Sequence, residues 1–166
     1  MLSVYEADRF INCQPLAMRA PEVFLRHRCA EPAQIWAVAA MLLVWMKLGF
    51  FGVRDKPKSS PDEAWCIVKL KRLFPEWRIP LPVVITNEAL KSTITTAFAM
   101  YKTPKPEEEL LQRILPFDEE IGKMEMPQEP RSLLRIMLVT DPQKRPSASS
   151  VLASAEYQAF AKLVDE

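Results

Sequence analysis

The sequence predicts a mainly helical protein, and two observations carry that prediction. Apolar residues recur at the three- and four-residue spacing of a helix face in several segments, and no stretch alternates apolar and polar residues as a half-buried strand would. Most of the 15 prolines lie between these segments, where they mark loops and helix starts. A chain of 166 residues can bury one hydrophobic core, so we expect a single domain over residues 1–166.

The strongest helix candidate is residues 33–46, which are apolar on every side. The preceding residues 1–22 show no sustained period and contain two prolines, so we expect a loop or an extended stretch there. A helix that is apolar all round is either buried on every side or lies in a membrane. The membrane alternative is the weaker one, because Lys47 and two glycines interrupt the 19 residues from 35 to 53.

A second helix is predicted to start at Ser60, which can act as its N-cap while Glu63 completes a capping box. The apolar residues of this helix fall on one side, and the basic residues Lys69 and Arg72 fall on the other. We interpret the basic side as a solvated face, and an anion site is the alternative.

Helix starts in the second half of the chain are predicted from their first residues. Asn87 can cap a helix over residues 90–101. Pro106 and the three glutamates after it open another, because acidic residues in a first turn complement the helix dipole; we interpret the acidic run as a helix start and not as a metal site. The remaining predicted helices cover residues 133–138, a stretch capped by Ser147, and residues 157–163.

The overall composition gives no sign of a charged partner. With 49% hydrophobic residues, 26% charged residues and a net charge of +1, the chain has no field that would attract nucleic acid or an anionic membrane, so we expect neither as a partner. Only three glycines are present, and no phosphate-cradling GxGxxG or GxxxxGK loop can be written with them.

Cysteine and histidine usage argues against a metal site. Cys13, Cys29 and Cys66 lie too far apart for a CxxC pair or a disulfide framework, and we interpret them as ordinary thiols of a reducing compartment. His27 is the only histidine, which argues against a histidine-based metal cluster and against a Ser-His-Asp triad. No signal peptide is indicated, so the expected location is the cytoplasm or the nucleus.

Three short segments carry a resemblance to a known family. Residues 14–25 read QPLAMRAPEVFL, residues 31–36 read EPAQIW, and residues 141–148 read DPQKRPSA. In this order they resemble the later part of the large lobe of eukaryotic protein kinases, from the end of the activation segment to the last helix. The resemblance is closest to the branch of cyclin-dependent, mitogen-activated and SR-protein kinases.

The resemblance is strongest over residues 13–53 and 130–160, whereas residues 54–126 are divergent or insertion-like. It implies a partial kinase-like large lobe, helical and without the N-terminal β lobe. It also implies a buried ion pair between Glu22 and Arg145 that holds the activation segment against the last helices. The segment before Glu22 would border the pocket for the substrate residue that follows the phosphoacceptor. The remnant of that pocket comprises Gln14, Pro15, Leu16, Met18 and Arg19, the last in the position of the branch's characteristic arginine.

Three positions within the matched part depart from the family pattern, and one of them is Ala39, where the family usually has a Gly. The family's usual Thr, which contacts the catalytic Asp, is here Pro15, which has neither a hydroxyl nor an amide proton. At the anchor of the central helix Trp36 matches, but the Asp that binds the catalytic-loop backbone is Gln34, which can hydrogen-bond and carries no charge. The catalytic motifs themselves are not found, and residues 8–10 (DRF) are not Asp-Phe-Gly.

The resemblance therefore implies a family activity that this chain is not equipped to perform. That activity is phosphorylation of protein serine or threonine with ATP and magnesium, and we identify no catalytic, cofactor-binding or metal-binding residue for it here, so we expect the chain to be inactive alone. Three hypotheses stay open: an inactive kinase-like chain, a helical interaction module whose protein partner covers exposed apolar surface, and a part of a whole kinase in which Met1 is an internal methionine.

Overall fold

A helix of 16 residues, α2 (Glu31–Met46), stands in the middle of the molecule. The computed structural model describes residues 14–165, and all regular structure in that range is helical, as the sequence predicts. In chain order, with η for a 3-10 helix, the elements are α1 (Pro21–Phe24), α2, α3 (Asp62–Leu73), η2 (Pro82–Val84), α4 (Glu88–Lys102), η3 (Pro106–Arg113), α5 (Phe117–Gly122), α6 (Gln128–Met137), α7 (Ala148–Leu152) and α8 (Ala155–Asp165).

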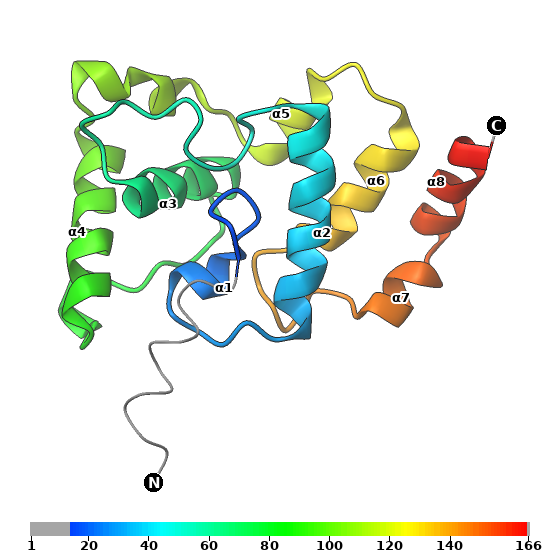
Figure 1. The fold of residues 1–166 in the computed structure, drawn as a ribbon, viewed down its shortest axis with the longest axis horizontal. Helices are drawn as coiled ribbons and strands as arrows, with labels where there is room; N and C mark the ends of the chain where they lie inside the picture. The colour runs from blue at the N-terminus through cyan, green and yellow to red at the C-terminus, as the bar shows by residue number, and fades with distance from the viewer. Residues whose placement is uncertain (1–13, 166) are drawn as a thin grey trace, which may run out of the picture.

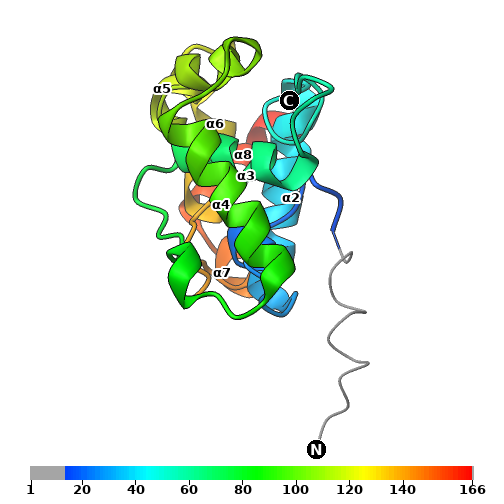
Figure 2. The ribbon, with the colours of Figure 1, turned by 90° about the vertical axis from the view of Figure 1, so that its left-hand side faces the viewer.

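The other long helices flank α2 in two groups. Figure 1 shows α3 and α4 on one side of α2, and α6 and α8 on the other. Seen from the α4 side, α4 lies in front of α3, and the two helices pack against each other (Figure 2). On the opposite side α6 packs against both α2 and α8. The chain therefore forms two helix pairs held to one central helix.

The predicted central helix is present, with Pro32 in its first turn and its last residue at Met46. The chain leaves it through two left-handed glycines, Gly49 at a φ of +83° and Gly52 at a φ of +79°. A Cβ on Gly52 would also lie 2.9 Å from the Cβ of Ala17, so this position has no room for a side chain. Among residues 14–165 no helix combines the length and the apolar content needed to cross a membrane.

The prediction that this helix is buried all round is wrong. Its inner side chains, among them Trp36 and Leu43, are buried, whereas Val38, Met41 and Trp45 are exposed on the outer side. Trp45 is the most exposed of these residues, at 84%. A helix without a polar face gives no sequence signal for which side is turned outward, and here only one side is covered by the rest of the described chain.

Five aromatic side chains form a closed circuit of ring contacts on the inner side of α2. Trp36 contacts Phe74 and Phe51 with ring centroids 5.4 and 6.0 Å apart. Phe117 stacks on Phe74 at 5.1 Å and meets Phe50 edge-on at 6.1 Å, and Phe50 meets Phe51 at 5.2 Å. These rings come from α2, the loop after it, the end of α3 and α5, so one cluster joins four parts of the chain.

The start of α3 differs from the prediction. The helix begins at Asp62, and Pro61 occupies the N-cap position without any side-chain cap. The hydroxyl of Ser60 donates a hydrogen bond to Glu108 Oε1 at 3.0 Å instead of capping the helix. Ser60 and Glu108 are both buried. The Ser60 side chain therefore bonds to a residue that is distant in the sequence and not to the first turn of α3, as the local pattern had predicted.

Lys69 is buried in α3, and the interpretation of its side as a solvated basic face is wrong at this position. Its side chain is 3% exposed, and its Nζ donates to the carbonyl oxygen of Gly49 at 2.7 Å and to Asp55 Oδ1 at 2.8 Å. A longer contact of 3.5 Å reaches the carbonyl oxygen of Gly52. Lys69 thus fixes the loop between α2 and α3 against the face of α3.

Two of the predicted caps are confirmed. The Asn87 side chain accepts a hydrogen bond from the Leu90 backbone N–H at 2.9 Å and opens α4, and Ser147 accepts one from the Ser150 N–H at 3.2 Å and opens α7. Both caps bond within their own first turn, so no distant part of the chain competes for them.

The segment after Pro106 is helical as predicted, but it forms the 3-10 helix η3. The carboxylate of Glu108 reaches back to the Lys105 backbone N–H at 3.0 Å and also receives the hydrogen bond from Ser60. The sequence did not predict α5, whose six residues are too short to show a period. Cys13 and residues 8–10, which figured in the sequence analysis, lie outside the described residues.

Candidate functional site

The best-defined polar site in residues 14–165 is a buried ion pair between Glu22 and Arg145. Glu22 lies in the four-residue helix α1, and Arg145 lies in the loop between α6 and α7. The two Nη atoms of the arginine meet the two carboxylate oxygens at 2.8 and 3.0 Å, and the two side chains are 7% and 0% exposed. This fork-to-fork geometry is the strongest form of an arginine–carboxylate contact.

Arg145 makes further contacts that join three parts of the chain. Its Nε donates to the carbonyl oxygen of Val139 at 2.8 Å, and one Nη also donates to the carbonyl oxygen of Pro32 at the start of α2. The guanidinium lies 5.3 Å from the ring of Trp36, within cation–π range. Figure 1 shows α1 and the loop before α7 close to the first turns of α2, where these contacts gather. The pair therefore ties α1 and the α6–α7 loop to the central helix.

Gln14 opens a compact turn that packs against the start of α2. It is buried, its Nε2 donates to the carbonyl oxygen of Ala33 at 2.8 Å, and its Oε1 accepts from the Ala20 N–H at 3.0 Å. The turn between these points is closed by the Met18 N–H, which donates to the carbonyl oxygen of Pro15 at 2.9 Å. Pro15 is exposed at the tip of the turn. Leu16 and Met18 are half-buried.

Arg19 is buried and fully engaged within the protein. Its Nε and one Nη donate to the carbonyl oxygen of Gln14, and the other Nη donates to Glu63 Oε1 at 2.7 Å. The guanidinium also lies 5.2 Å from the ring of Phe24. With its nitrogens engaged in this way, Arg19 acts here as an internal tie and not as a free group at the edge of a pocket.

Sequence reasoning missed the carboxylate that Arg19 meets and a second arginine beside it. Arg26 places both Nη atoms on the two oxygens of Glu63, at 3.1 and 2.7 Å. Arg26 has a φ of +65°, a strained value for a residue with a side chain, and the bidentate contact helps to hold it there. Glu63 is 37 and 44 positions away from its two partners, so no local pattern could have indicated the contact.

We expect the Glu63 cluster to make the stability of the protein sensitive to acid. Burial raises the pKa of Glu63, but the hydrogen bond and charge of Arg26, followed by those of Arg19, outweigh burial and hold the pKa below its ordinary value of 4.5. A lowered pKa in the folded state means that the stabilisation is present above about pH 4.5 and is lost as the pH falls below it. Glu63→Gln should therefore be less stable than the wild type at neutral pH, and the difference should shrink on acidification.

Urea unfolding of both proteins at about pH 7, 4.5 and 3 measures this difference. A gap between the two midpoints that stays constant over this range would contradict the assignment, because it would show that the carboxyl charge contributes nothing.

The two positions at the start of the central helix have different surroundings. Trp36 is buried under Arg145 and between two phenylalanines, as a core anchor should be. Gln34 is exposed, and its amide donates to the Sγ of Cys29 at 3.4 Å. The structure therefore includes Trp36 in the polar site and leaves Gln34 outside it.

A groove of about 700 Å³ opens beside Glu22, between α1, the turn after α3 and the loop before α7. Charged groups of both signs line it, among them Arg78 and Lys144 on the basic side and Glu76 and Asp141 on the acidic side. Opposite charges in one open groove give no preference for a ligand of one sign. Within residues 14–165 no three His, Cys, Asp or Glu side chains are grouped so that they could hold a metal ion.

The described cysteine nearest to these clusters is chemically quiet. Cys66 is buried in α3, and burial raises the pKa of its thiol to about 12. A thiol with that pKa is protonated at neutral pH and is a poor nucleophile. The arrangement as a whole joins helices through buried ion pairs and hydrogen bonds.

Comparison with models of known families finds no match for this chain, and a sequence search of curated proteins finds none.

Proposed function

We propose that the chain is a protein-kinase-like domain fragment, formed by the later part of the large lobe, in which the Glu22–Arg145 pair has an architectural role. The observation that carries this proposal is that pair. It is buried, bidentate, and spans 123 positions between the two segments that resemble the family motifs. Its packing against Trp36, which lies in the remaining matching segment, residues 31–36, gives further support.

The family activity is phosphorylation of serine or threonine in proteins, and we propose that this chain does not perform it alone. Phosphoryl transfer needs groups that cradle the phosphates, hold magnesium and orient the hydroxyl. Arg19, the matched residue nearest to the substrate pocket, is occupied by Gln14 and Glu63. Pro15 and Gln34 both lack the group that the family uses at their positions.

Thermal unfolding with and without magnesium–ATP tests this absence of nucleotide binding. A site occupied at one hundred times its dissociation constant would add about 2.7 kcal/mol of stability. We expect no shift of the midpoint at millimolar magnesium–ATP, with an intact kinase as the positive control. A magnesium-dependent rise of several degrees would contradict the proposal.

The kinase-like assignment has a separate test in the gene. Genomic sequence read upstream of the Met1 codon either does or does not encode His-Arg-Asp and Asp-Phe-Gly in frame. Their presence would support the assignment and make this chain part of a whole kinase. An unrelated continuous reading frame upstream would count against it.

A second candidate function is a non-enzymatic interaction module. It is favoured by the exposed apolar side of α2, where Trp45 is 84% and Val38 46% exposed. Large exposed apolar patches usually mark a partner surface. The candidate fails if the purified chain stays monomeric at high concentration and if Trp45, its most exposed described tryptophan, is not protected by any added partner.

A further inference from the structure

The loop between α2 and α3, residues 47–61, presents three oxygen atoms to one buried ammonium group. The Nζ of Lys69 donates to the carbonyl oxygen of Gly49 at 2.7 Å and to Asp55 Oδ1 at 2.8 Å. A longer contact of 3.5 Å reaches the carbonyl oxygen of Gly52. An ammonium group has three protons to donate, so each of them has an acceptor in this loop. We call these three oxygen atoms the oxygen cradle.

The cradle depends on the ammonium group that it surrounds. Among residues 14–165 no backbone N–H donates to the carbonyl oxygen of Gly49 or of Gly52. Both glycines have a positive φ, so the backbone of the loop follows a course that few other residues adopt. The carboxylate of Asp55 also accepts a hydrogen bond from the indole N–H of Trp65 at 3.3 Å, which holds it on the side of α3.

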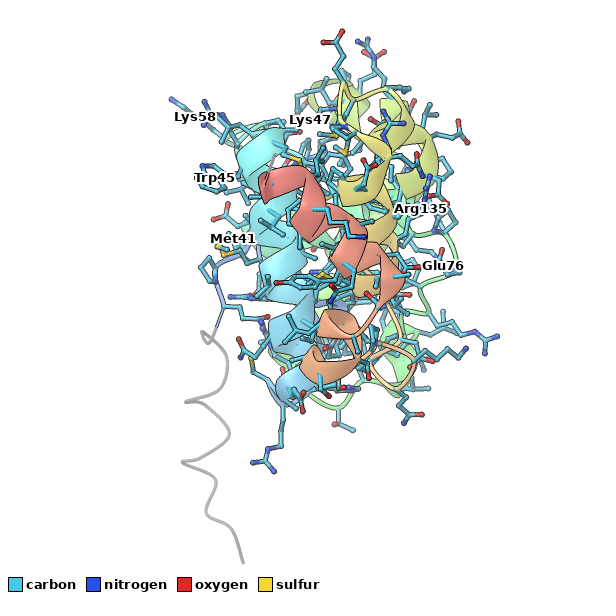
Figure 3. All side chains as sticks on the ribbon, turned by 90° about the vertical axis from the view of Figure 1, so that its right-hand side faces the viewer. Met41, Trp45, Lys47, Lys58, Glu76 and Arg135 are labelled. Atoms are coloured by element: carbon cyan, nitrogen blue, oxygen red, sulfur yellow. The ribbon has the colours of Figure 1, made fainter. Side chains whose placement is uncertain are left out.

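The cation in the cradle comes from α3, although the loop has lysines of its own. Figure 3 shows Lys58 projecting from the surface and Lys47 at the end of α2. The Nζ of Lys47 lies 3.7 Å from a carboxylate oxygen of Glu120. Figure 1 shows the loop passing over α3 before it enters the first residue of that helix, which brings the cradle to the side chain of α3 that fills it.

The composition of the cradle suits a monovalent cation. It offers two carbonyl oxygens and a single carboxylate, whereas calcium sites usually recruit several carboxylates. In potassium channels backbone carbonyl oxygens replace the hydration shell of the ion, and the ammonium ion is close to potassium in size. A cavity of about 10 Å³ beside Lys69, lined also by Gly52 and Cys66, adds a little space next to the cradle.

We propose that the oxygen cradle is a monovalent-cation site, which the ammonium group of Lys69 occupies as a built-in ion. When the lysine side chain is removed, the cradle binds a free ammonium ion, and it binds potassium more weakly because potassium cannot donate hydrogen bonds. The inference goes beyond the proposed function and is independent of the kinase resemblance, since it rests only on contacts made by the loop after α2 and by α3.

Lys69→Ala tests the site, because alanine removes the ammonium group and leaves space for an ion. Urea unfolding of the full chain is measured in ammonium, potassium and tetramethylammonium chloride at equal ionic strength. We expect ammonium at about 0.1 M to raise the ratio of folded to unfolded chain about tenfold, as a dissociation constant on the order of 10 mM implies. Potassium should have a smaller effect. Tetramethylammonium should have none, because it is too large and has no proton to donate.

The other variants serve as controls. Lys69→Met is the matched one: methionine removes the same charge but fills the space, so ammonium should not stabilise it. Adding Asp55→Asn to Lys69→Ala should remove most of the ammonium effect, since the carboxylate supplies the negative charge of the cradle. The wild type should respond alike to the three salts, because its site is already filled. Hydrogen exchange of residues 47–56 in Lys69→Ala should slow when ammonium is added, which locates the effect in the loop.

Equal responses of Lys69→Ala to ammonium and to tetramethylammonium would overturn the proposal. An ammonium effect of the same size in Lys69→Met or in the wild type would overturn it as well, because the salt would then act on the whole protein. If Lys69→Ala is unfolded without ammonium, circular dichroism decides the matter. Recovery of the helical signal on addition of ammonium supports the site, and a signal that stays unfolded overturns it.

Discussion

Glu22→Gln should lower the free energy of unfolding by about 3 to 5 kcal/mol, a large part of the stability of a domain of this size. The substitution keeps the shape of the side chain and removes its charge, which leaves the guanidinium of Arg145 buried without a counter-charge. Water cannot replace the lost partner, because the Arg145 side chain is 0% exposed. Urea or guanidinium titration followed by circular dichroism measures the change.

An exposed pair in the same protein provides the control. Glu88→Gln removes one partner of the Glu88–Lys91 pair on α4, whose side chains are 82% and 41% exposed, and should cost no more than about 1 kcal/mol. Replacing Glu22 and Arg145 together with Leu and Met should recover part of the loss, since no buried charge then remains. Equal effects of Glu22→Gln and Glu88→Gln would show that burial of the first pair adds nothing to its strength.

Lys69→Met is the second substitution for which we expect a large effect, a loss of about 2 to 4 kcal/mol. Methionine fills a similar space, but the carbonyl oxygens of Gly49 and Gly52 lose a donor that reaches them inside the protein. Asp55, 37% exposed, can turn to water, so most of the cost comes from the two carbonyls.

The companion variants separate charge from position. Asp55→Asn keeps an oxygen acceptor for Lys69 and should cost less than Lys69→Met. Lys91→Met, at an exposed lysine of α4, should change the stability by no more than about 1 kcal/mol. If Lys69→Met proves as mild as Lys91→Met under urea titration, then Lys69 is not holding the loop between α2 and α3.

The parts of the fold that follow from local signals could be predicted from the sequence. Asn87 and Ser147 cap α4 and α7 with bonds inside their own first turns. The all-helical class follows from the spacing of apolar residues. In these cases the chain within one or two turns contains all the groups that decide the outcome.

Prediction failed where a distant residue decided the outcome. Ser60 was expected to cap a helix, and Glu108, 48 positions away, accepts its hydrogen bond instead. Lys69 was interpreted as solvated, because its acceptors lie in a loop whose course no pattern reveals. Glu63 was assigned to a capping box and lies between two arginines.

The polar site and the exposed side of α2 also depend on contacts between residues that are far apart in the sequence. Glu22 and Arg145 could be paired from the sequence only through a resemblance, since nothing local connects residues so far apart. The outward side of α2 could not be predicted at all, because Trp36 and Trp45 look alike in an apolar run although one is buried and the other is exposed.

The separation of Glu22 and Arg145 has a consequence for the order in which the chain folds. Their contact closes a loop of 123 positions. Closing so long a loop lowers the entropy of the chain, and this cost opposes the contact until other parts of the fold have brought its two ends together. Early folding is therefore expected to begin in closer neighbours such as α3 and α4, which pack against each other directly. The ion pair would then form late and slow the unfolding of a structure that it did not nucleate.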